Sequence, residues 1–319
     1  MGLPKKPLFM KQKLMRRVMI SLVPIIIVSI YFFGLRALVL LIWVTAIGIL
    51  AEWFFERQYH KPISEAVIVT CMLYTLTLPP GTPFWIAAVG IIFGIVFGKE
   101  VFGGFGKNIF NPALVGRCFV YVSFPEPLTI HWVKPAAGFP GGFALWLTEP
   151  IDAISQSTPM LIFRETGQME SWIKLFIGNI PGSLGETSAL VIILSAIYLI
   201  YTKSASWQTM LAVLAGYFAM STSLFLMGAP PIPSPILGCL SGGLLFGTVF
   251  MATDPISSPV TMEGKWIYGV LIGIVTVIIR GYALFAGGIM FAILIGNTFS
   301  PLIDETVKLY KNSRKKVAL

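Results

Sequence analysis

Long apolar segments alternate with short polar ones along most of the chain. A helix needs about 20 apolar residues to cross the hydrocarbon core of a bilayer, and several segments fall short of that length, so we expect some helices to be tilted, broken or shielded by their neighbours. The ten segments cover residues 18–33, 37–53, 66–78, 84–98, 109–124, 188–201, 207–227, 236–252, 266–279 and 283–300. This pattern predicts an all-α polytopic membrane protein with about ten transmembrane helices.

One polar segment, residues 125–186, is much longer than the other connections. It carries six Asp and Glu residues against three Lys and Arg residues, and Pro, Gly and Trp recur in it. Connections of this length are usually functional, and this composition predicts a folded cap on the membrane surface. We therefore divide the chain into a membrane half (1–124), this loop, a second membrane half (187–305) and a basic tail (306–319).

Composition and charge support this class. Mean hydropathy is +0.83, 56% of the residues are apolar, and the net charge is +9. If the chain crosses the membrane ten times and begins in the cytoplasm, 17 Lys and Arg residues fall on the side of the two termini and five on the other side. The positive-inside rule then predicts cytoplasmic termini and an extracytoplasmic long loop. We expect the basic ends to face anionic membrane lipid, and the charge requires no nucleic acid. The first apolar segment lacks a small-residue cleavage site, so we interpret it as an uncleaved helix.

The sequence contains a short internal match. Residues 90–97 and 243–250 share the pattern G-x-x-F-G-x-V-F, and a proline lies ten residues before each. The match suggests two repeated helical halves, as in many transport folds, but Gly- and Phe-rich helices also match by chance. It pairs the fourth segment with the eighth, which implies a parallel repeat; a miscounted span would make the repeat inverted.

Few residues fit a metal site or a cluster. Cys71, Cys118 and Cys239 lie singly in apolar segments, without the paired spacing of zinc or iron–sulfur ligands, and we interpret them as buried small hydrophobic residues. The two histidines, His60 and His131, are predicted on opposite faces of the membrane, which argues against a bis-histidine haem. We predict no metal site and no catalytic residue for an overall reaction.

Five motifs occur in order along nearly the whole chain. They are GGFGKNIFNPALVG (103–116), IDAISQSTP (151–159), GNIPGSLGETS (178–188), FMATDPISSP (250–259) and FAILIGN with PLID (291–297 and 301–304). Together they resemble the NqrB/RnfD family, which contains the RnfD component of the Rnf complex and the NqrB component of the sodium-pumping NADH:quinone reductase. The length of the chain and its brief N-terminal segment resemble RnfD more than the longer NqrB.

The resemblance implies a covalent flavin on Thr158. In that family a threonine that precedes proline carries FMN through a phosphoester, and Thr158 precedes Pro159. Ser157, which is also small, stands where we expect alanine. A threonine hydroxyl is a poor nucleophile unaided, so attachment requires an FAD-dependent FMN transferase. Asp152 and Ser155 favour an accessible turn around the threonine, and we include both in the flavin-binding set. Without the resemblance, this segment would be an ordinary Ser- and Thr-rich loop.

Two residues of the first motif are weaker candidates for the same cofactor. Asn111 and Pro112 predict a helix start, because Asn caps free N–H groups and Pro fits the first position. Such an N-terminus can hold an anion or a reduced flavin, or can be a tight structural joint. Arg117 lies inside this helix. We interpret it either as a counter-charge for a flavin or an acidic partner, or as part of a structural ion pair. Glu186 is interpreted as a capping residue of the next span, and Asp254 as structural or as a coupling-ion ligand.

The resemblance implies a membrane electron-carrier subunit of an Rnf-type ferredoxin:NAD oxidoreductase that translocates Na⁺ or H⁺. We expect it in a bacterial or archaeal cell membrane, with other Rnf-type subunits as partners and with a second, noncovalent flavin, riboflavin, whose position the sequence leaves open. The alternatives are the NqrB component of a Na⁺-pumping NADH:quinone reductase, a flavin-free transporter or channel, and a structural scaffold for neighbouring subunits.

Overall fold

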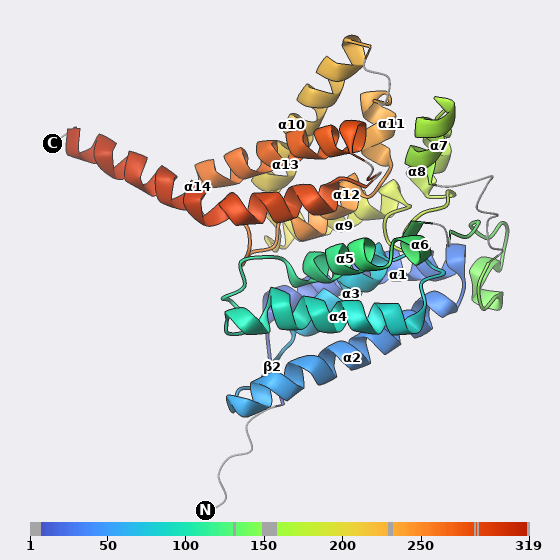
Figure 1. The fold of residues 1–319 in the computed structure, drawn as a ribbon, viewed down its shortest axis with the longest axis horizontal. Helices are drawn as coiled ribbons and strands as arrows, with labels where there is room; N and C mark the ends of the chain where they lie inside the picture. Colours follow the sequence, from blue (N-terminus) through green and yellow to red (C-terminus); the bar gives the residue numbers. More distant parts are fainter. Residues whose placement is uncertain are drawn as a thin grey trace, which may run out of the picture.

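The computed structural model describes residues 8–129, 132–148, 158–228, 232–283, 285 and 287–317. The described chain is almost wholly helical (Figure 1). Two strands of two residues, β1 (Phe9–Met10) and β2 (Ile63–Ser64), pair in parallel beside the start of α1. The all-α class predicted from the apolar pattern is confirmed.

The helices follow the predicted apolar segments closely. The first half contains α1 (Lys13–Phe33), α2 (Arg36–Gln58), α3 (Ala66–Thr77), α4 (Phe84–Gly98), the 3-10 turn η1 (Glu100–Phe102) and α5 (Pro112–Ser123). The second half contains α9 (Ala189–Tyr201), α10 (Trp207–Leu226), α11 (Pro235–Leu240), α12 (Leu244–Phe246), the π-helical turn η3 (Gly247–Met251), α13 (Met262–Tyr282) and α14 (Ile289–Val317). Each of the ten predicted segments overlaps at least one of these elements.

Five of the described helices are long and apolar enough to cross a membrane: α1, α2, α4 continued by η1, α10 and α13. The helices α3, α5 and α9 are apolar but only 12 or 13 residues long, so they cannot span a bilayer core unaided. The membrane class is therefore supported, and the count of ten spans stays a prediction.

The eighth predicted segment is a broken helix. Gly242 and Gly243 both have left-handed backbone conformations, with φ of 63° and 71°, which ends α11 before α12 begins. Only glycine adopts such consecutive conformations at little cost. Breaks of this kind are tolerated within a membrane protein where surrounding protein satisfies the freed backbone groups.

The order of helix contacts recurs in the two halves. Helix α2 packs on α4 as α10 packs on α13, and α4 packs on α5 as α13 packs on α14. Helix α1 contacts α3, and α9 contacts α12. These contacts pair α4 with α13, whereas the sequence match pairs residues 90–97 of α4 with residues 243–250 of α12 and η3. The predicted pairing of the fourth and eighth segments is thus not the one that the packing suggests.

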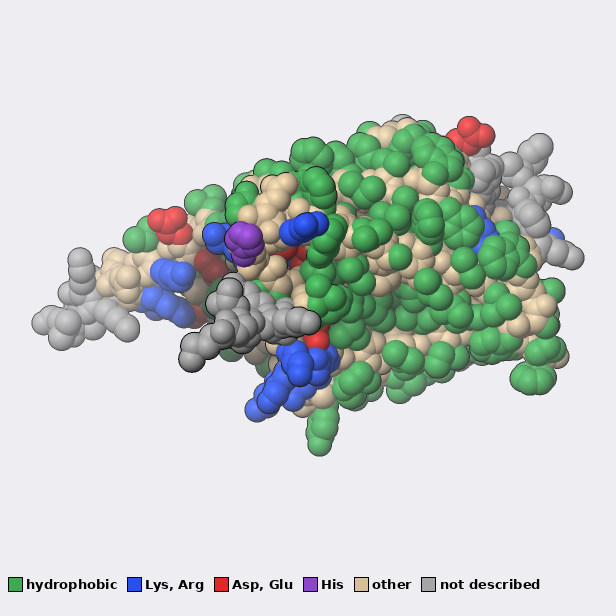
Figure 2. All heavy atoms as spheres, turned by 90° about the horizontal axis from the view of Figure 1, so that it is seen from below, with side chains coloured by type: hydrophobic (Ala, Val, Ile, Leu, Met, Phe, Trp, Pro, Cys, Tyr) green, Lys and Arg blue, Asp and Glu red, His purple; other side chains and the backbone are tan. Residues whose placement is uncertain are grey.

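The surface separates apolar and charged groups along the molecule. Hydrophobic side chains cover most of the visible body, and Lys and Arg gather towards the end from which α14 projects (Figure 2). Side chains on the outer faces of helices, such as Ile42, Leu194 and Ile197, are more than half exposed. Lipid would cover such side chains in a membrane. The direction in which the chain crosses the membrane stays a prediction.

The long loop is folded in the part that the structure describes. It contains α6 (Pro125–Thr129), η2 (Gly141–Ala144), α7 (Pro159–Thr166) and α8 (Trp172–Ile177). These elements gather at the end opposite the projecting part of α14 (Figure 1). Main-chain hydrogen bonds from Leu35 and Arg36 to the carbonyls of Leu145 and Trp146 join it to the α1–α2 turn. Asp152 and Ser155, the predicted turn before Thr158, lie outside the described residues.

Candidate functional site

A large cavity lies among α5, α6, α7 and the broken helix. The space between its atoms, including open solvent at its mouth, is about 1120 Å³. Segments far apart in the sequence form its walls, and the fold alone brings them together. Its lining includes Thr158, Arg117, Tyr121, Glu186, Gly243 and Phe291.

Thr158 lies at the wall of this cavity, directly before α7. Its main-chain carbonyl accepts hydrogen bonds from the N–H groups of Leu161 (2.8 Å) and Ile162 (3.0 Å), and Pro159 takes the first helical position. A threonine at this N-cap position commonly uses its hydroxyl to cap a free N–H group. The Thr158 side chain makes no such bond. Its half-buried hydroxyl is therefore not committed to the helix.

Arg117 and Glu186 place opposite charges on the same cavity. The Nη1 atom of Arg117 is buried and has no hydrogen-bond partner among the described residues, and Arg117 forms no salt bridge there. Both predicted roles of Arg117, as a counter-charge and as part of a structural ion pair, stay predictions. A buried, unsatisfied guanidinium N–H is costly, so it is a natural place for a polar ligand group.

Glu186 is not the capping residue that the sequence suggested. The N-cap of helix α9 is Ser188, two positions after Glu186, and the first turn of the helix contains no acidic residue. The Glu186 carboxylate lines the cavity instead and accepts a hydrogen bond from Ser183. Burial raises the pKa of Glu186, and the positive charge of Arg117 partly opposes this effect.

The break between α11 and α12 at Gly242 and Gly243, which we call the glycine break, lines the cavity next to the Glu186 carboxylate. A Cβ atom on Gly243 would lie 2.6 Å from Cδ of Glu186, so only glycine allows this approach. Arg280, which is 2% exposed, stabilises the glycine break. Its guanidinium donates hydrogen bonds to the carbonyls of Gly238 (2.7 Å), Ser241 (3.0 Å) and Gly242 (2.8 Å). It thereby satisfies carbonyls that the end of α11 leaves free.

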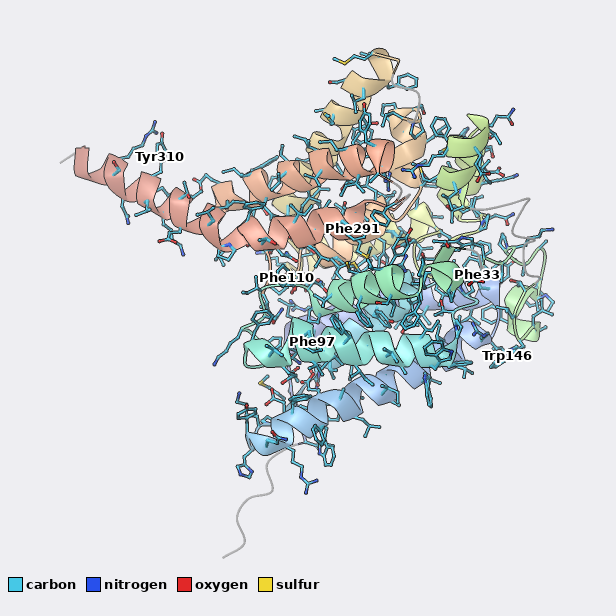
Figure 3. All side chains as sticks on the ribbon, viewed as in Figure 1. Phe33, Phe97, Phe110, Trp146, Phe291 and Tyr310 are labelled. Atoms are coloured by element: carbon cyan, nitrogen blue, oxygen red, sulfur yellow. The ribbon has the colours of Figure 1, made fainter. Side chains whose placement is uncertain are left out.

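Aromatic rings form another wall of the cavity. The ring centroids of Phe285 and Phe291 are 4.6 Å apart, and that of Tyr121 is 5.5 Å from Phe285 and 6.4 Å from Phe291. Figure 3 labels Phe291 near the start of α14. Aromatic walls with a few polar groups suit a flat conjugated ligand. Within the described residues, a threonine hydroxyl that does not cap α7, the unpartnered Nη1 atom of Arg117 and these rings fit the FMN that the family resemblance implies at Thr158.

Comparison with known proteins assigns the family. The profile of the NQR2, RnfD, RnfE family matches residues 9–311. The chain belongs to this family. Its relatives include NqrB components of the Na(+)-translocating NADH-quinone reductase: that of Azotobacter vinelandii is 40% identical over 84% of this chain, and that of Klebsiella pneumoniae subsp. pneumoniae is 38% identical over 86%. The matches cover 65% and 67% of those proteins, so the chain spans about two thirds of their length. The resemblance read from the motifs is confirmed.

In this family member, the predicted site residues fall into two separate places. Asn111 caps α5 as predicted, because its Oδ1 atom accepts from the N–H of Ala113 at 3.0 Å. However, Asn111 lines a second, smaller cavity, which it shares with Lys99, Asn108 and Asp254 and which does not include Thr158. Only Arg117, among the described candidates, lies in the cavity of Thr158.

The candidate coupling acid Asp254 has local partners in the second cavity. Its carboxylate accepts hydrogen bonds from the Ser257 hydroxyl at 2.8 Å and from the Ile256 N–H at 3.3 Å. These bonds shape a tight turn after η3. The structural interpretation of Asp254 accounts for them, and its predicted role in ion coupling stays a prediction.

A buried ionic network, which the sequence did not indicate, lies between α2, β2 and the end of α4. The ammonium group of Lys99 donates to the Glu52 carboxylate and to the Ser64 hydroxyl (2.7 Å). Carboxylates of Glu52, Glu56 and Glu100 lie within 4.8 Å of one another. Lys99 balances part of this negative charge, so the network acts as a structural ion cluster that joins α2, β2 and the end of α4.

Proposed function

We propose that this chain is a flavin-carrying electron-relay subunit of an ion-translocating oxidoreductase in a membrane. The observation that carries the proposal is that the Thr158 hydroxyl makes no capping bond to α7 and lies at a cavity where Nη1 of Arg117 has no partner among the described residues. The relatives named above favour the NADH:quinone reductase alternative over the Rnf-type ferredoxin:NAD reaction. Other subunits would supply the remaining redox sites.

FMN joined to Thr158 would supply one- and two-electron redox chemistry at this cavity. Attachment forms a bond from Thr158 Oγ to the FMN phosphorus and breaks the pyrophosphate bond of FAD, releasing AMP; the transferase accepts the hydroxyl proton. Arg117 offers a positive charge to an electron-rich ring, and the aromatic wall excludes water from it. Glu186, whose pKa burial raises, is able to hold a proton at the same cavity.

The second cavity is our proposed place for the noncovalent riboflavin. Asn108, Asn111 and Lys99 line it together with apolar side chains from α1 and η3. Amide groups can form hydrogen bonds with ring carbonyls and with a ribityl chain, while the Lys99 ammonium, which is bonded to Glu52 and Ser64, adds a positive charge nearby. Two cavities at different places in the membrane domain suit a relay with two stations.

The proposal is tested by expressing the chain with and without an FMN transferase that modifies a known substrate protein. We expect flavin fluorescence on a denaturing gel, and one added FMN in the intact mass, only when the transferase is present. An unmodified mass in the presence of the active transferase would contradict the proposal. In the purified complex, NADH-driven quinone reduction would support the quinone reductase type, and reduction of NAD by ferredoxin would support the Rnf type.

Arg117→Gln is expected to lower the midpoint potential of the covalent flavin, because it removes a positive charge that stabilises the reduced ring. A loss of about 1.4 kcal/mol of differential stabilisation corresponds to roughly 30 mV for a two-electron couple. Spectroelectrochemical titration of the purified protein measures this shift. Arg117→Lys keeps the charge and should shift the potential less. Equal potentials in the wild type and both variants would remove Arg117 from the proposed site.

A further inference from the structure

Among the described residues, helix α7, which begins directly after Thr158, makes few contacts with the other helices. Met160 is 1% exposed and packs near the glycine break, where a Cβ atom on Gly242 would lie 3.2 Å from its Cγ. The following side chains, up to Phe163, are only half-buried, and Glu165 and Thr166 are exposed. On the side of α7, the position of Thr158 therefore depends on a small number of described contacts.

The strongest polar contact comes from Arg164, in the last turn of α7. Its Nη2 atom donates to the carbonyl of Ala283 at 2.7 Å and to the carbonyl of Arg280. Both acceptors lie at the C-terminal end of α13, where a helix leaves carbonyls without internal partners. A guanidinium there also lies at the negative end of the α13 dipole. Arg164 thus caps α13 from a helix 116 positions away in the sequence.

The same end of α13 also contacts the glycine break, which lines the cavity. The main-chain carbonyl of Arg280 accepts from Arg164, and the side chain of Arg280 donates to carbonyls of Gly238, Ser241 and Gly242. Arg164 therefore fixes α7 to the element that holds the glycine break. Met160 packs on the glycine break directly. The contacts of Arg164 and Met160 together therefore define where Thr158 lies relative to the glycine break.

We propose that Arg164 is a positioning residue that clamps α7 to α13 and so holds Thr158 and its attached group over the cavity. This inference rests on the proposed function, because it concerns the same flavin. It has a second consequence for maturation. Thr158 is half-buried in the docked arrangement, and a transferase needs free access to its hydroxyl, so release of the Arg164 clamp favours modification and its closure follows modification.

The experiment compares Arg164→Gln, Arg164→Lys and the matched control Glu165→Gln, an exposed neighbour on the same helix. Hydrogen exchange is first measured on protein from a host without the transferase, so that no flavin is present. We expect the α7 amides, including that of Gly167, which bonds to the Phe163 carbonyl, to exchange about tenfold faster in Arg164→Gln than in the wild type. Arg164→Lys should lie between them, and Glu165→Gln should match the wild type.

The second measurement uses protein made with the transferase. We expect Arg164→Gln to be flavinylated at least as fast as the wild type, while its flavin fluorescence becomes severalfold more sensitive to quenching by iodide. A variant that is merely misfolded would lose both its flavin and its protection from hydrogen exchange. Faster exchange of α7 together with undiminished flavinylation is therefore specific to loss of the clamp.

Two outcomes would overturn the clamp. One is unchanged α7 exchange and unchanged quenching in Arg164→Gln. The other is faster exchange across α10 and α13 as well, which would assign Arg164 to general folding. If the wild type carries no flavin but α7 exchange rises selectively in Arg164→Gln, the clamp stands and the flavin assignment fails. Measurements on the protein without flavin therefore distinguish the clamp from the flavin attachment.

Discussion

Thr158→Ala is expected to abolish covalent flavin, because the variant lacks the oxygen that would form the phosphoester. Fluorescence on a denaturing gel should fall from that of one flavin per chain to background, and the intact mass should fall to that of the polypeptide. Electron transfer through the assembled complex should decrease by orders of magnitude, because the proposed relay would lose one of its redox centres. Intact-mass spectrometry and quinone reduction measure these effects.

Two matched variants show whether this loss is specific to the hydroxyl at Thr158. Thr166→Ala removes another hydroxyl from the same helix, one that is exposed and bonded to the carbonyl of Ile162 at 2.8 Å, and it should keep full flavin content. Thr158→Ser retains a hydroxyl and should retain at least part of the flavin. Persistent fluorescence in Thr158→Ala would place the attachment elsewhere.

The apolar pattern predicted the helices well where local signals mark their ends. Helix α4 has the predicted bounds, because Pro83 precedes it and the apolar run ends at Lys99. Helix α5 starts at Pro112 after its Asn111 cap, as the capping chemistry indicates. The break at Gly242 was not predicted within residues 236–252. Two glycines in an apolar run are compatible with a continuous helix, and the support that Arg280 gives to the break is visible only in the folded protein.

The candidate site was predictable only where a residue has a signature of its own. Thr158 was found through a motif and Arg117 through the cost of a charge in an apolar helix. Arg164 and Arg280 were missed as site residues because their partners are main-chain carbonyls, which leave no pattern in the sequence. Glu186 was misinterpreted for a related reason: its neighbour Gly243 belongs to another element, and only the fold brings them together.

The buried network around Lys99 gives a second large expected effect. The side chains of Lys99 and Glu52 are 3% and 0% exposed, so neither charge is solvated by water. The Glu52 carboxylate also accepts from the N–H and the hydroxyl of Ser64, both at 2.8 Å. A pair in this environment adds little net stability compared with neutral residues, but removal of one partner leaves an uncompensated buried charge.

Lys99→Met should therefore destabilise the protein by about 3–5 kcal/mol, because Glu52 then stays buried without its counter-ion. Thermal unfolding of the purified protein, at fixed detergent and protein concentration, should show a midpoint lower by several degrees. The matched control is Lys311→Met, which breaks the pair with Glu263, whose side chains are 49% and 51% exposed; exposed pairs contribute at most about 1 kcal/mol. The double variant Glu52→Gln with Lys99→Met should recover part of the loss, since it removes both charges of the pair but leaves the neighbouring carboxylates of Glu56 and Glu100 without Lys99. If Lys99→Met unfolds at the same temperature as Lys311→Met, the buried pair does not carry the stability assigned to it.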